Sequence, residues 1–366
     1  MHILGIESSC DDTSVALLDS SEQGHFIIAE KTFSQIEIHQ KYGGVVPEIA
    51  GRMHAEKIAP IIEEVLKDQP KPDVIAVTAG PGLITGLIVA VEAARTLSYA
   101  WNIPIVATNH ISGHVHSVEI QKEKDLPALQ PILFPALALI VSGGHTELIL
   151  MKSHTECTIL GRTKDDAAGE CFDKVASLLG FVYPGGPHIS REAVNGNSHA
   201  IEFPRPMIHD KSYDFSFSGL KTAALYWLRD HSLAALPIGL STPAGIFGTQ
   251  QTSPTQADFC ASFEQAIIDV LVTKTMRAAE EHKPKSIILG GGVSANKKLR
   301  EALSAAVHAD FPETNIHLPP PGYSMDNGAM IAVAGYYQAL NKNFTDWSAL
   351  AANPNWRIDT EFTKNK

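Results

Sequence analysis

Short strand-like segments alternate with helix-like segments along most of this chain, and this alternation constrains the fold more than any other feature. The first half opens with three strand candidates, continues with an amphipathic helix and then alternates strands with helices. Its segments are Ile3–Glu7, Ser14–Asp19, Phe26–Ser34, Pro47–Lys67, Val74–Thr78, Leu83–Trp101, Ile105–Ala107 and a helix starting near His110. Such alternation predicts an α/β fold with parallel strand pairing.

The second half of the chain follows the same plan. It opens with a hairpin candidate, adds a third strand and then alternates helices with strands. Its segments are Ala136–Val141, Glu147–Met151, Thr158–Arg162, Phe259–His282, Ser286–Leu289, Ala295–Ala309 and Ala329–Leu340. No repeat is visible in the residues themselves, so the order of elements alone predicts a duplicated α/β domain with a cleft between the copies.

The length of the chain agrees with two lobes, because 366 residues exceed one ordinary core. We expect residues 1–124 to form the first lobe together with 328–366, and residues 125–327 to form the second. Within these limits, Glu119–Pro135 is a plausible connector, and 232–256 has the composition of an inserted surface loop. The tail after Asn341 shows little periodicity and is expected to lie over the surface.

Composition narrows the class of protein. The net charge of −11 argues against a broad, nonspecific grip on nucleic acid, which requires lysine and arginine. The four cysteines form no C-x-x-C pair, which favours a reducing compartment. Met1 leads directly into a strand-like run, and the most apolar helix carries Glu92 and Arg95. We therefore expect a cytoplasmic protein without a membrane span.

Two histidines form the first candidate site. His110 and His114 are four residues apart, so their imidazoles lie on one helical face and can converge on one ion. Paired histidines at this spacing are common by chance, and the alternative interpretation is a polar helix face of solvated histidines. The residue after His110 is Ile111, so the H-E-x-x-H motif of zinc proteases is absent.

Three glycine-rich turns form the second candidate, and each is expected to follow a strand. They are Ser142-Gly143-Gly144, Pro184-Gly185-Gly186-Pro187 and Gly290-Gly291-Gly292. Glycine lets the backbone approach a phosphate or a flat ring, although most such turns are only turns. The third turn is the most informative, because it joins a buried strand to a helix whose N-terminus would face a ligand.

Three acidic residues have two interpretations each, and a fourth, Asp166, has one. Asp11, in the polar turn after the first strand, either belongs to a plain turn or orients an attacking group. Asp166 is a candidate helix cap, and Asp173 points either to solvent or into the cleft. Asp326 is either an N-cap or a third metal ligand, and spacing alone cannot bring it to His110.

Taken together, these segments resemble the tRNA threonylcarbamoyladenosine transferase family of the actin-like ATPase superfamily. The resemblance runs from Met1 to about Tyr337. The matching stretches are 5–13, 41–50, 79–83, 110–114, 141–146, 166–173, 183–187, 290–296 and 326–332. The implied fold is a pair of duplicated actin-like (RNase H-like, ASKHA) lobes with a central cleft.

The resemblance also implies the site residues. His110, His114 and Asp326 would bind one divalent metal, with Fe²⁺ favoured over Zn²⁺, and Asp11 would assist catalysis. An adenine nucleotide would lie in a pocket formed by Ile140, Val141, Ser142, Gly143, Gly144, Asp173, Gly186 and Asn296.

The implied reaction moves a threonylcarbamoyl group from threonylcarbamoyl-AMP to the exocyclic amine of adenosine 37 in tRNA. The tRNAs concerned read codons that begin with A. The implied partners are tRNA, an inactive actin-like paralogue and a small P-loop ATPase. Because the chain is acidic, tRNA binding is expected to depend on the partner or on a local patch formed by Lys283, Lys285, Lys297, Lys298 and Arg300.

Three features depart from the family pattern. Asp12 replaces an expected glutamate, Gly51 replaces an expected serine, and the segment 232–256 is longer than usual. Two other functions stay open, namely a metallopeptidase and an actin-like ATPase that serves as a binding module. The first requires a general base beside a metal-bound water, and the second has no need of the histidines.

Overall fold

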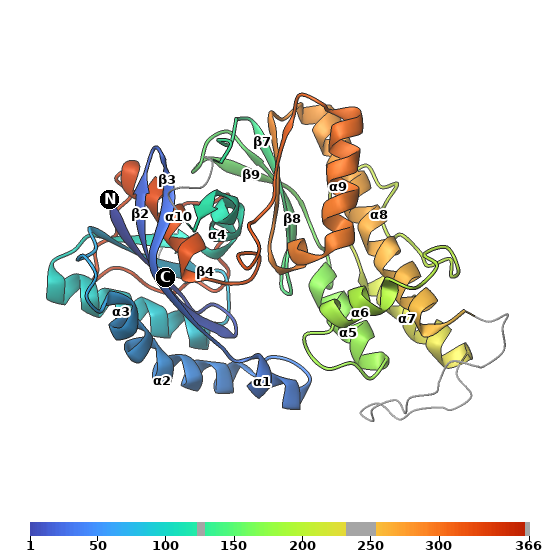
Figure 1. Cartoon of the computed structure of the whole chain (residues 1–366), viewed down its shortest axis with the longest axis horizontal. Coiled ribbons are helices and arrows are strands. Elements are labelled where there is room, and N and C mark those ends of the chain that lie inside the picture. The colour runs from blue at the N-terminus through green and yellow to red at the C-terminus, as the bar shows by residue number, and fades with distance from the viewer. Residues whose placement is uncertain (123–128, 232–253, 363–366) are drawn as a thin grey trace.

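The computed structural model describes residues 1–122, 129–231 and 254–362, and it contains two β-sheets side by side with helices around each (Figure 1). The expected connector lies partly outside the described residues, and the expected inserted loop 232–256 lies mostly outside them. Among the described residues, no helix is long and apolar enough to cross a membrane.

The first sheet has the strand order β5-β4-β1-β2-β3-β6. Its strands are β1 (His2–Glu7), β2 (Asp12–Ser21), β3 (Gly24–Ser34), β4 (Val74–Gly80), β5 (Ile105–Asn109) and β6 (Ile120–Gln121). β1, β2 and β3 pair antiparallel, whereas β1, β4 and β5 pair parallel. The predicted parallel pairing is therefore confirmed for the strands that alternate with helices.

The second sheet has the order β11-β10-β7-β8-β9. Its strands are β7 (Ala136–Val141), β8 (Thr146–Met151), β9 (Cys157–Arg162), β10 (Ser286–Gly290) and β11 (Asn315–His317). β7 pairs antiparallel with β8 on one side and parallel with β10 on the other, as β1 does with β2 and β4. The two lobes thus repeat one plan, which confirms the predicted duplicated fold.

Helices cover the sheets. They are α1 (Ile36–His39), α2 (Pro47–Leu66), α3 (Ile84–Trp101), α4 (His110–His116), α5 (Ala168–Leu178), α6 (Gly186–Ala193), α7 (Ser218–His231), α8 (Gln256–His282), α9 (Lys297–Asp310) and α10 (Gly328–Leu340). Three short 3₁₀ helices are η1 (Gln40–Tyr42), η2 (Ser117–Glu119) and η3 (Gly292–Ala295).

Both faces of the first sheet are buried, which explains why β1 and β4 read as continuous apolar runs. Successive side chains of a strand point to opposite faces. Leu4 of β1 accordingly packs in the core beneath α2 and α3, while its neighbour Ile3 packs against α10. The C-terminal helix therefore returns to the lobe with which the chain began.

The tail after Asn341 is less superficial than expected. Leu350 and Trp356 are only 2% and 8% exposed, and both join the core of the first lobe. The expectation of a tail lying only over the surface is wrong at these positions, because two apolar side chains can anchor a segment that has no periodic pattern. On this packing we propose the lobe limits 1–124 with 328–366, and 125–327.

One further expectation is wrong. The turn Pro184-Gly185-Gly186-Pro187 follows helix α5 and leads into α6, rather than following a strand. Its composition indicates a turn but contains no information about the element that precedes it.

Candidate active site and metal centre

The two predicted histidine ligands lie on α4, which begins directly after β5. The side-chain oxygen of Asn109 accepts hydrogen bonds from the N–H groups of Ile111 (2.9 Å) and Ser112 (3.4 Å) and so caps this short helix. One helical turn then separates His110 from His114, and their ring centroids are 4.6 Å apart.

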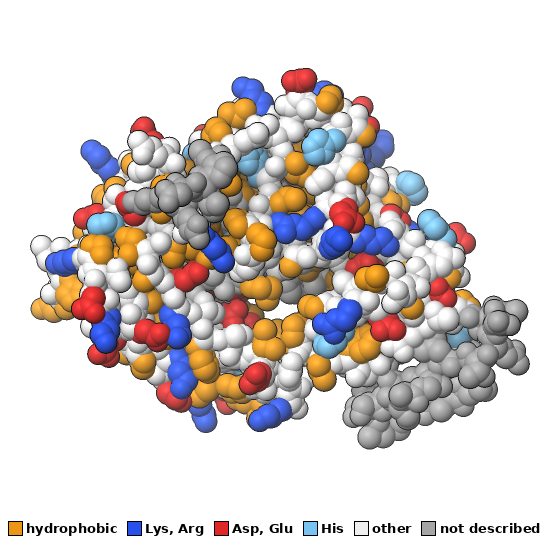
Figure 2. All heavy atoms as spheres, viewed as in Figure 1, with side chains coloured by type: hydrophobic (Ala, Val, Ile, Leu, Met, Phe, Trp, Pro, Cys, Tyr) orange, Lys and Arg blue, Asp and Glu red, His pale blue; other side chains and the backbone are white. Residues whose placement is uncertain are grey.

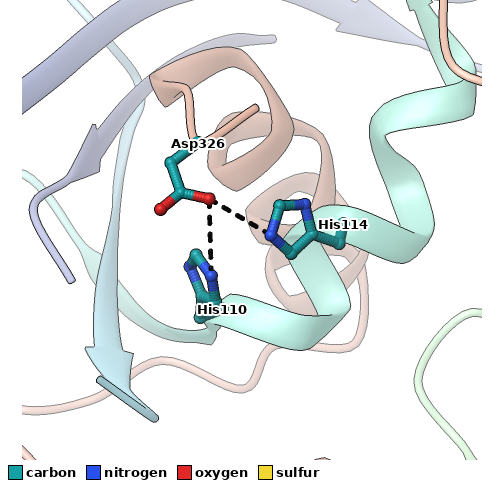
Figure 3. A group of neighbouring side chains, drawn as sticks. All are labelled: His110, His114 and Asp326. Carbon is teal, nitrogen blue, oxygen red and sulfur yellow. Dashed lines mark ion pairs between the residues drawn. The ribbon is translucent and has the colours of Figure 1, made fainter. Parts of the chain in front are cut away.

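Asp326 reaches the same point from the segment before α10. Asn327, not Asp326, caps that helix, by accepting a hydrogen bond from the N–H of Met330 at 2.8 Å. The Asp326 carboxylate is therefore free to face α4. Its Oδ1 lies 3.2 Å from Nε2 of His114 and 3.6 Å from Nε2 of His110 (Figure 3).

The three side chains fit a divalent metal. One ligand atom from each lies within 4.8 Å of the other two. Among the described residues, neither buried ring nitrogen of His114 makes a hydrogen bond, although Nε2 lies 3.2 Å from Oδ1 of Asp326. A metal ion between this nitrogen and the carboxylate would satisfy both groups. Two imidazoles and one carboxylate suit either iron or zinc.

Glu7 supports His110 from behind, and sequence reasoning assigned it no role. The Oε2 atom of this fully buried carboxylate lies 3.0 Å from Nδ1 of His110 and accepts a hydrogen bond from Thr78 at 2.6 Å. With a proton on Nδ1, the Nε2 lone pair of His110 points toward Asp326. A carboxylate as the last residue of an apolar strand was the available signal.

Charges within the site are balanced by one another. Burial lowers the pKa of His110, but the carboxylates of Asp326 and Glu7 outweigh burial and raise this pKa to about 9. Burial raises the pKa of Asp326, but His110 and His114 outweigh burial and hold it well below its usual range. The buried carboxylates therefore require a positive charge beside them, either a proton or a metal ion.

A cavity of about 860 Å³ opens beside the metal ligands, between the two lobes (Figure 2). It brings together several predicted site residues from distant parts of the sequence. These are Asp11, His110, Ser142, Gly143, Gly144, Asp173 and Asp326. Tyr183, Lys174 and Lys221, which sequence reasoning did not single out as site residues, also line it.

Asp11 lies in the wall of this cavity. Tyr183 donates a weak hydrogen bond of 3.4 Å to its Oδ2. Burial, and then the nearby Asp326, raise the pKa of Asp11, and they raise that of Asp12 to about 7. A raised pKa brings a carboxylate closer to the range in which it accepts protons efficiently near neutral pH.

The turn after β7 is open toward the cavity. Nothing lies within 4 Å of a Cβ added at Gly143 or Gly144, so the protein itself does not require glycine there. At Gly291 the requirement is internal, since its φ is +85° and an added Cβ would lie 2.4 Å from the carbonyl oxygen of Val141. The turn at Gly143 and Gly144 thus leaves room for a ligand, whereas the glycine at position 291 is required by the packing of the protein itself.

Four of the predicted pocket residues are not part of the described cavity lining. Ile140 and Val141 are fully buried in β7. Gly186 donates its N–H to Oδ1 of Asp173 at 3.3 Å, and Asn296 caps α9. The proposed pocket roles of these four residues rest on the family resemblance.

Asp166 does not cap α5, whose N-cap position is occupied by Ala167. The Asp166 carboxylate instead pairs with Lys174 and Lys221, 3.0 Å and 2.5 Å away. The prediction of a cap is wrong because the helix begins one residue later than the pattern suggested.

The fold and this cleft define the class of protein, that of the actin-like superfamily with its two similar lobes. HypF from T. kodakarensis is a solved structure with a similar fold. The TM-score is 0.57 at 13% identity, over 93% of this chain and 48% of that one. This likeness concerns the fold alone.

The family itself follows from sequence comparison. The family model for tRNA N6-adenosine threonylcarbamoyltransferase matches residues 26–333. Relatives of that name from Listeria innocua and Bacillus subtilis are 43% and 44% identical to the chain. The matches cover 96% and 92% of this chain, and 95% and 90% of the relatives. The chain belongs to this family.

Proposed function

We propose that this chain transfers the threonylcarbamoyl group from threonylcarbamoyl-AMP to the exocyclic amine of adenosine 37 in tRNAs that read codons beginning with A. One observation supports this most strongly. In a chain 43–44% identical to relatives named for this reaction, Asp11, His110 and Asp326 line one cavity between the lobes. Because tRNA is the substrate, we place the reaction in the cytoplasm.

The residues of the cleft have separate tasks in this proposal. The open turn at Gly143 and Gly144 lets the adenylate approach the backbone. Asp11 accepts the proton that the adenosine amine loses as its nitrogen bonds to the carbamoyl carbon. The bond from that carbon to the phosphate oxygen breaks, and AMP leaves.

A metal bound by His110, His114 and Asp326 would supply Lewis-acid polarisation of the carbonyl or phosphate oxygen. We propose Fe²⁺, with Zn²⁺ as the alternative ion. Glu7 holds His110 in the tautomer that exposes its Nε2 lone pair, and the pairing of Asp326 with both imidazoles keeps that carboxylate ionised.

The decisive experiment supplies threonylcarbamoyl-AMP and unmodified tRNA to the reconstituted system, with and without this chain. Mass spectrometry of the digested tRNA then measures threonylcarbamoyladenosine. We expect the modified nucleoside only when the chain is present, and a large loss of single-turnover transfer in Asp11→Asn. The matched control is Asp310→Asn, at an exposed position. Full transfer by Asp11→Asn would exclude this residue as the base.

The same reconstitution separates the two other functions. A metallopeptidase would cleave an added protein substrate in a chelator-sensitive manner. An ATPase module would hydrolyse ATP equally well in His110→Ala. Formation of the modified nucleoside, with neither protein cleavage nor ATP hydrolysis of this kind, supports the proposed transferase function.

We propose that an inactive actin-like paralogue covers the groove between α2 and α3. This groove is mainly apolar and is lined by Ile58, Ile62, Leu66, Ile88, Val89 and Leu97, among others. Ile88 is 47% exposed and joins the other apolar side chains of the groove into one contiguous patch, a feature typical of protein–protein interfaces. Ile88→Glu should abolish copurification with the paralogue, whereas Glu63→Gln at the rim should not. The small P-loop ATPase is proposed from the family resemblance alone.

The proposed tRNA-binding patch divides into two groups. Lys283 and Lys285 precede β10, whereas Lys297 and Lys298 open α9 beyond the other end of that strand. On the visible face, basic side chains are interspersed with acidic ones (Figure 2). We therefore propose that the partner supplies much of the contact with tRNA. Tight tRNA binding by the isolated chain would contradict this proposal.

A further inference from the structure

A second cluster of metal-ligating side chains lies outside the cleft, where the two lobes meet. His116 ends α4, Glu119 ends η2, and His154 belongs to the turn between β8 and β9. His116 follows His114 by two residues, so the two side chains leave the helix in nearly opposite directions. One ligand atom from each of the three side chains lies within 4.8 Å of the other two.

The hydrogen bonds of His116 point to a cation between these side chains. Its Nε2 lies 3.1 Å from the carbonyl oxygen of His154, which can only accept a hydrogen bond, so Nε2 carries a proton. Its Nδ1 lies 2.6 Å from Oε2 of Glu119. This nitrogen and this carboxylate oxygen face each other closely enough for one cation to contact both.

His154 offers the third ligand atom of this cluster. Its Nδ1 lies 3.9 Å from the same Glu119 oxygen and, among the described residues, is buried without a hydrogen-bond partner. A metal ion would satisfy all three side chains at once.

A neighbouring side chain holds Glu119 and His154 in place. Such supporting contacts are usual around the ligands of metal sites. Tyr337 donates its O–H to Oε1 of Glu119 at 2.7 Å. Its ring stacks on that of His154, with centroids 3.7 Å apart and an interplanar angle of 5°. Burial lowers the pKa of His154 to about 4, so its imidazole is neutral at pH 7 and able to bind a metal.

We propose that His116, Glu119 and His154 bind a second divalent cation, of the zinc class. Two imidazole nitrogens and one carboxylate suit tetrahedral zinc, with water as the fourth ligand. Zinc–ligand bonds of about 2.0–2.1 Å place neighbouring ligand atoms roughly 3.3 Å apart. The 2.6 Å pair must open by about 0.7 Å and the 3.9 Å pair must close by about 0.6 Å.

The position of this cluster has a structural consequence. His154 also lines a cavity of about 800 Å³ under the C-terminal tail. His116 and Glu119 lie between β5 and β6 of the first sheet, whereas His154 joins two strands of the second. The ion would therefore tie one lobe to the other, away from the catalytic cavity.

The test measures zinc in the full chain. The protein is stripped with chelator, reloaded with Zn²⁺, desalted and analysed by inductively coupled plasma mass spectrometry. We expect about two ions in the wild type, one in His154→Ala, one in Glu119→Gln and one in Asp326→Asn. Combining Asp326→Asn with His154→Ala should leave none. His308→Ala, at an exposed position on α9, is the matched control and should retain two.

The two metal sites can fail separately in this design. Loss of an ion in Asp326→Asn alone concerns the catalytic cleft. A single ion in the wild type that both His154→Ala and Glu119→Gln retain, or two ions in both of these variants, would overturn the second site. If circular dichroism shows that either variant is unfolded, X-ray absorption of zinc-loaded Asp326→Asn decides whether the second site exists. Two imidazole nitrogens are expected around its remaining ion, and any other ligand set refutes the assignment.

Discussion

Glu7→Gln should weaken metal binding in the cleft, although Glu7 does not face the metal. In the native protein Glu7 accepts three hydrogen bonds, from the N–H of Ser9, the hydroxyl of Thr78 and Nδ1–H of His110. Glutamine has nearly the same shape, but one of its two terminal atoms is a donor. The substitution therefore changes the hydrogen-bond pattern rather than the packing.

Either orientation of the glutamine amide is unfavourable. If its NH₂ group replaces Oε2, it donates to Nδ1 of His110, and the ring proton must move to Nε2. That tautomer has no lone pair to offer on the side of Asp326. If its NH₂ group replaces Oε1, it opposes the N–H of Ser9 inside a fully buried site.

Loss of an outer partner of this kind usually costs about 10–100-fold in metal affinity, or roughly 1.4–2.8 kcal/mol. Competition with a chromophoric chelator measures this affinity for Zn²⁺ or Fe²⁺. Glu64→Gln serves as the control, because Glu64 pairs with Lys31 on the surface. If Glu7→Gln folds normally and binds metal as tightly as the wild type, Glu7 does not fix the tautomer of His110.

Three further predictions concern the frame around the site. Asn327→Ala removes the cap of α10 and should lower the free energy of unfolding by about 1 kcal/mol in urea titrations, while also weakening metal binding through Asp326. Gly5→Ala should cost at least about 2 kcal/mol, because its Cβ would lie 2.0 Å from the carbonyl oxygen of Gly328. Gly143→Ala, with nothing within 4 Å, should change stability by less than about 0.5 kcal/mol; equal costs would contradict the packing. Burial raises the pKa of Glu147 to about 7, so between pH 4.5 and 7 the folded chain keeps a proton that the unfolded chain releases, and stability falls as pH rises. Glu147→Gln should remove this fall and be about 1–3 kcal/mol more stable than the wild type at pH 8, but not at pH 4; equal pH dependence in denaturant titrations would refute it.

Much of the fold could be predicted because its signals are local. Apolar runs of strand length alternate with longer helical patterns, and parallel pairing follows from that order. The position of Trp356 could not be predicted in this way, because one buried side chain in an aperiodic tail leaves no pattern. The element that precedes the glycine-rich turn before α6 could not be predicted either. The composition of a turn does not indicate whether a strand or a helix comes before it.

The candidate site was predictable in part for a related reason. Helical spacing places His110 and His114 together, since four residues make about one turn. Glu7 was missed because its role depends on β1 lying beside the start of α4, a contact between residues 103 positions apart. His116 and His154 likewise come together only when the lobes are assembled.

Asp326 shows how the fold itself provides the third ligand. Two glycines let α10 lie directly on the first sheet, since a Cβ at Gly5 or at Gly328 would meet backbone atoms of the other element. The hydroxyl of Ser14 accepts the N–H of Gly328, and Asn327 caps the helix one residue earlier. Backbone packing on β1 and β2 therefore sets the position of the Asp326 carboxylate opposite α4. Although Asp326 falls within the proposed limits of the second lobe, its distance from the imidazoles is set by this packing on the first sheet, and we expect that distance to persist if the rest of the second lobe shifts.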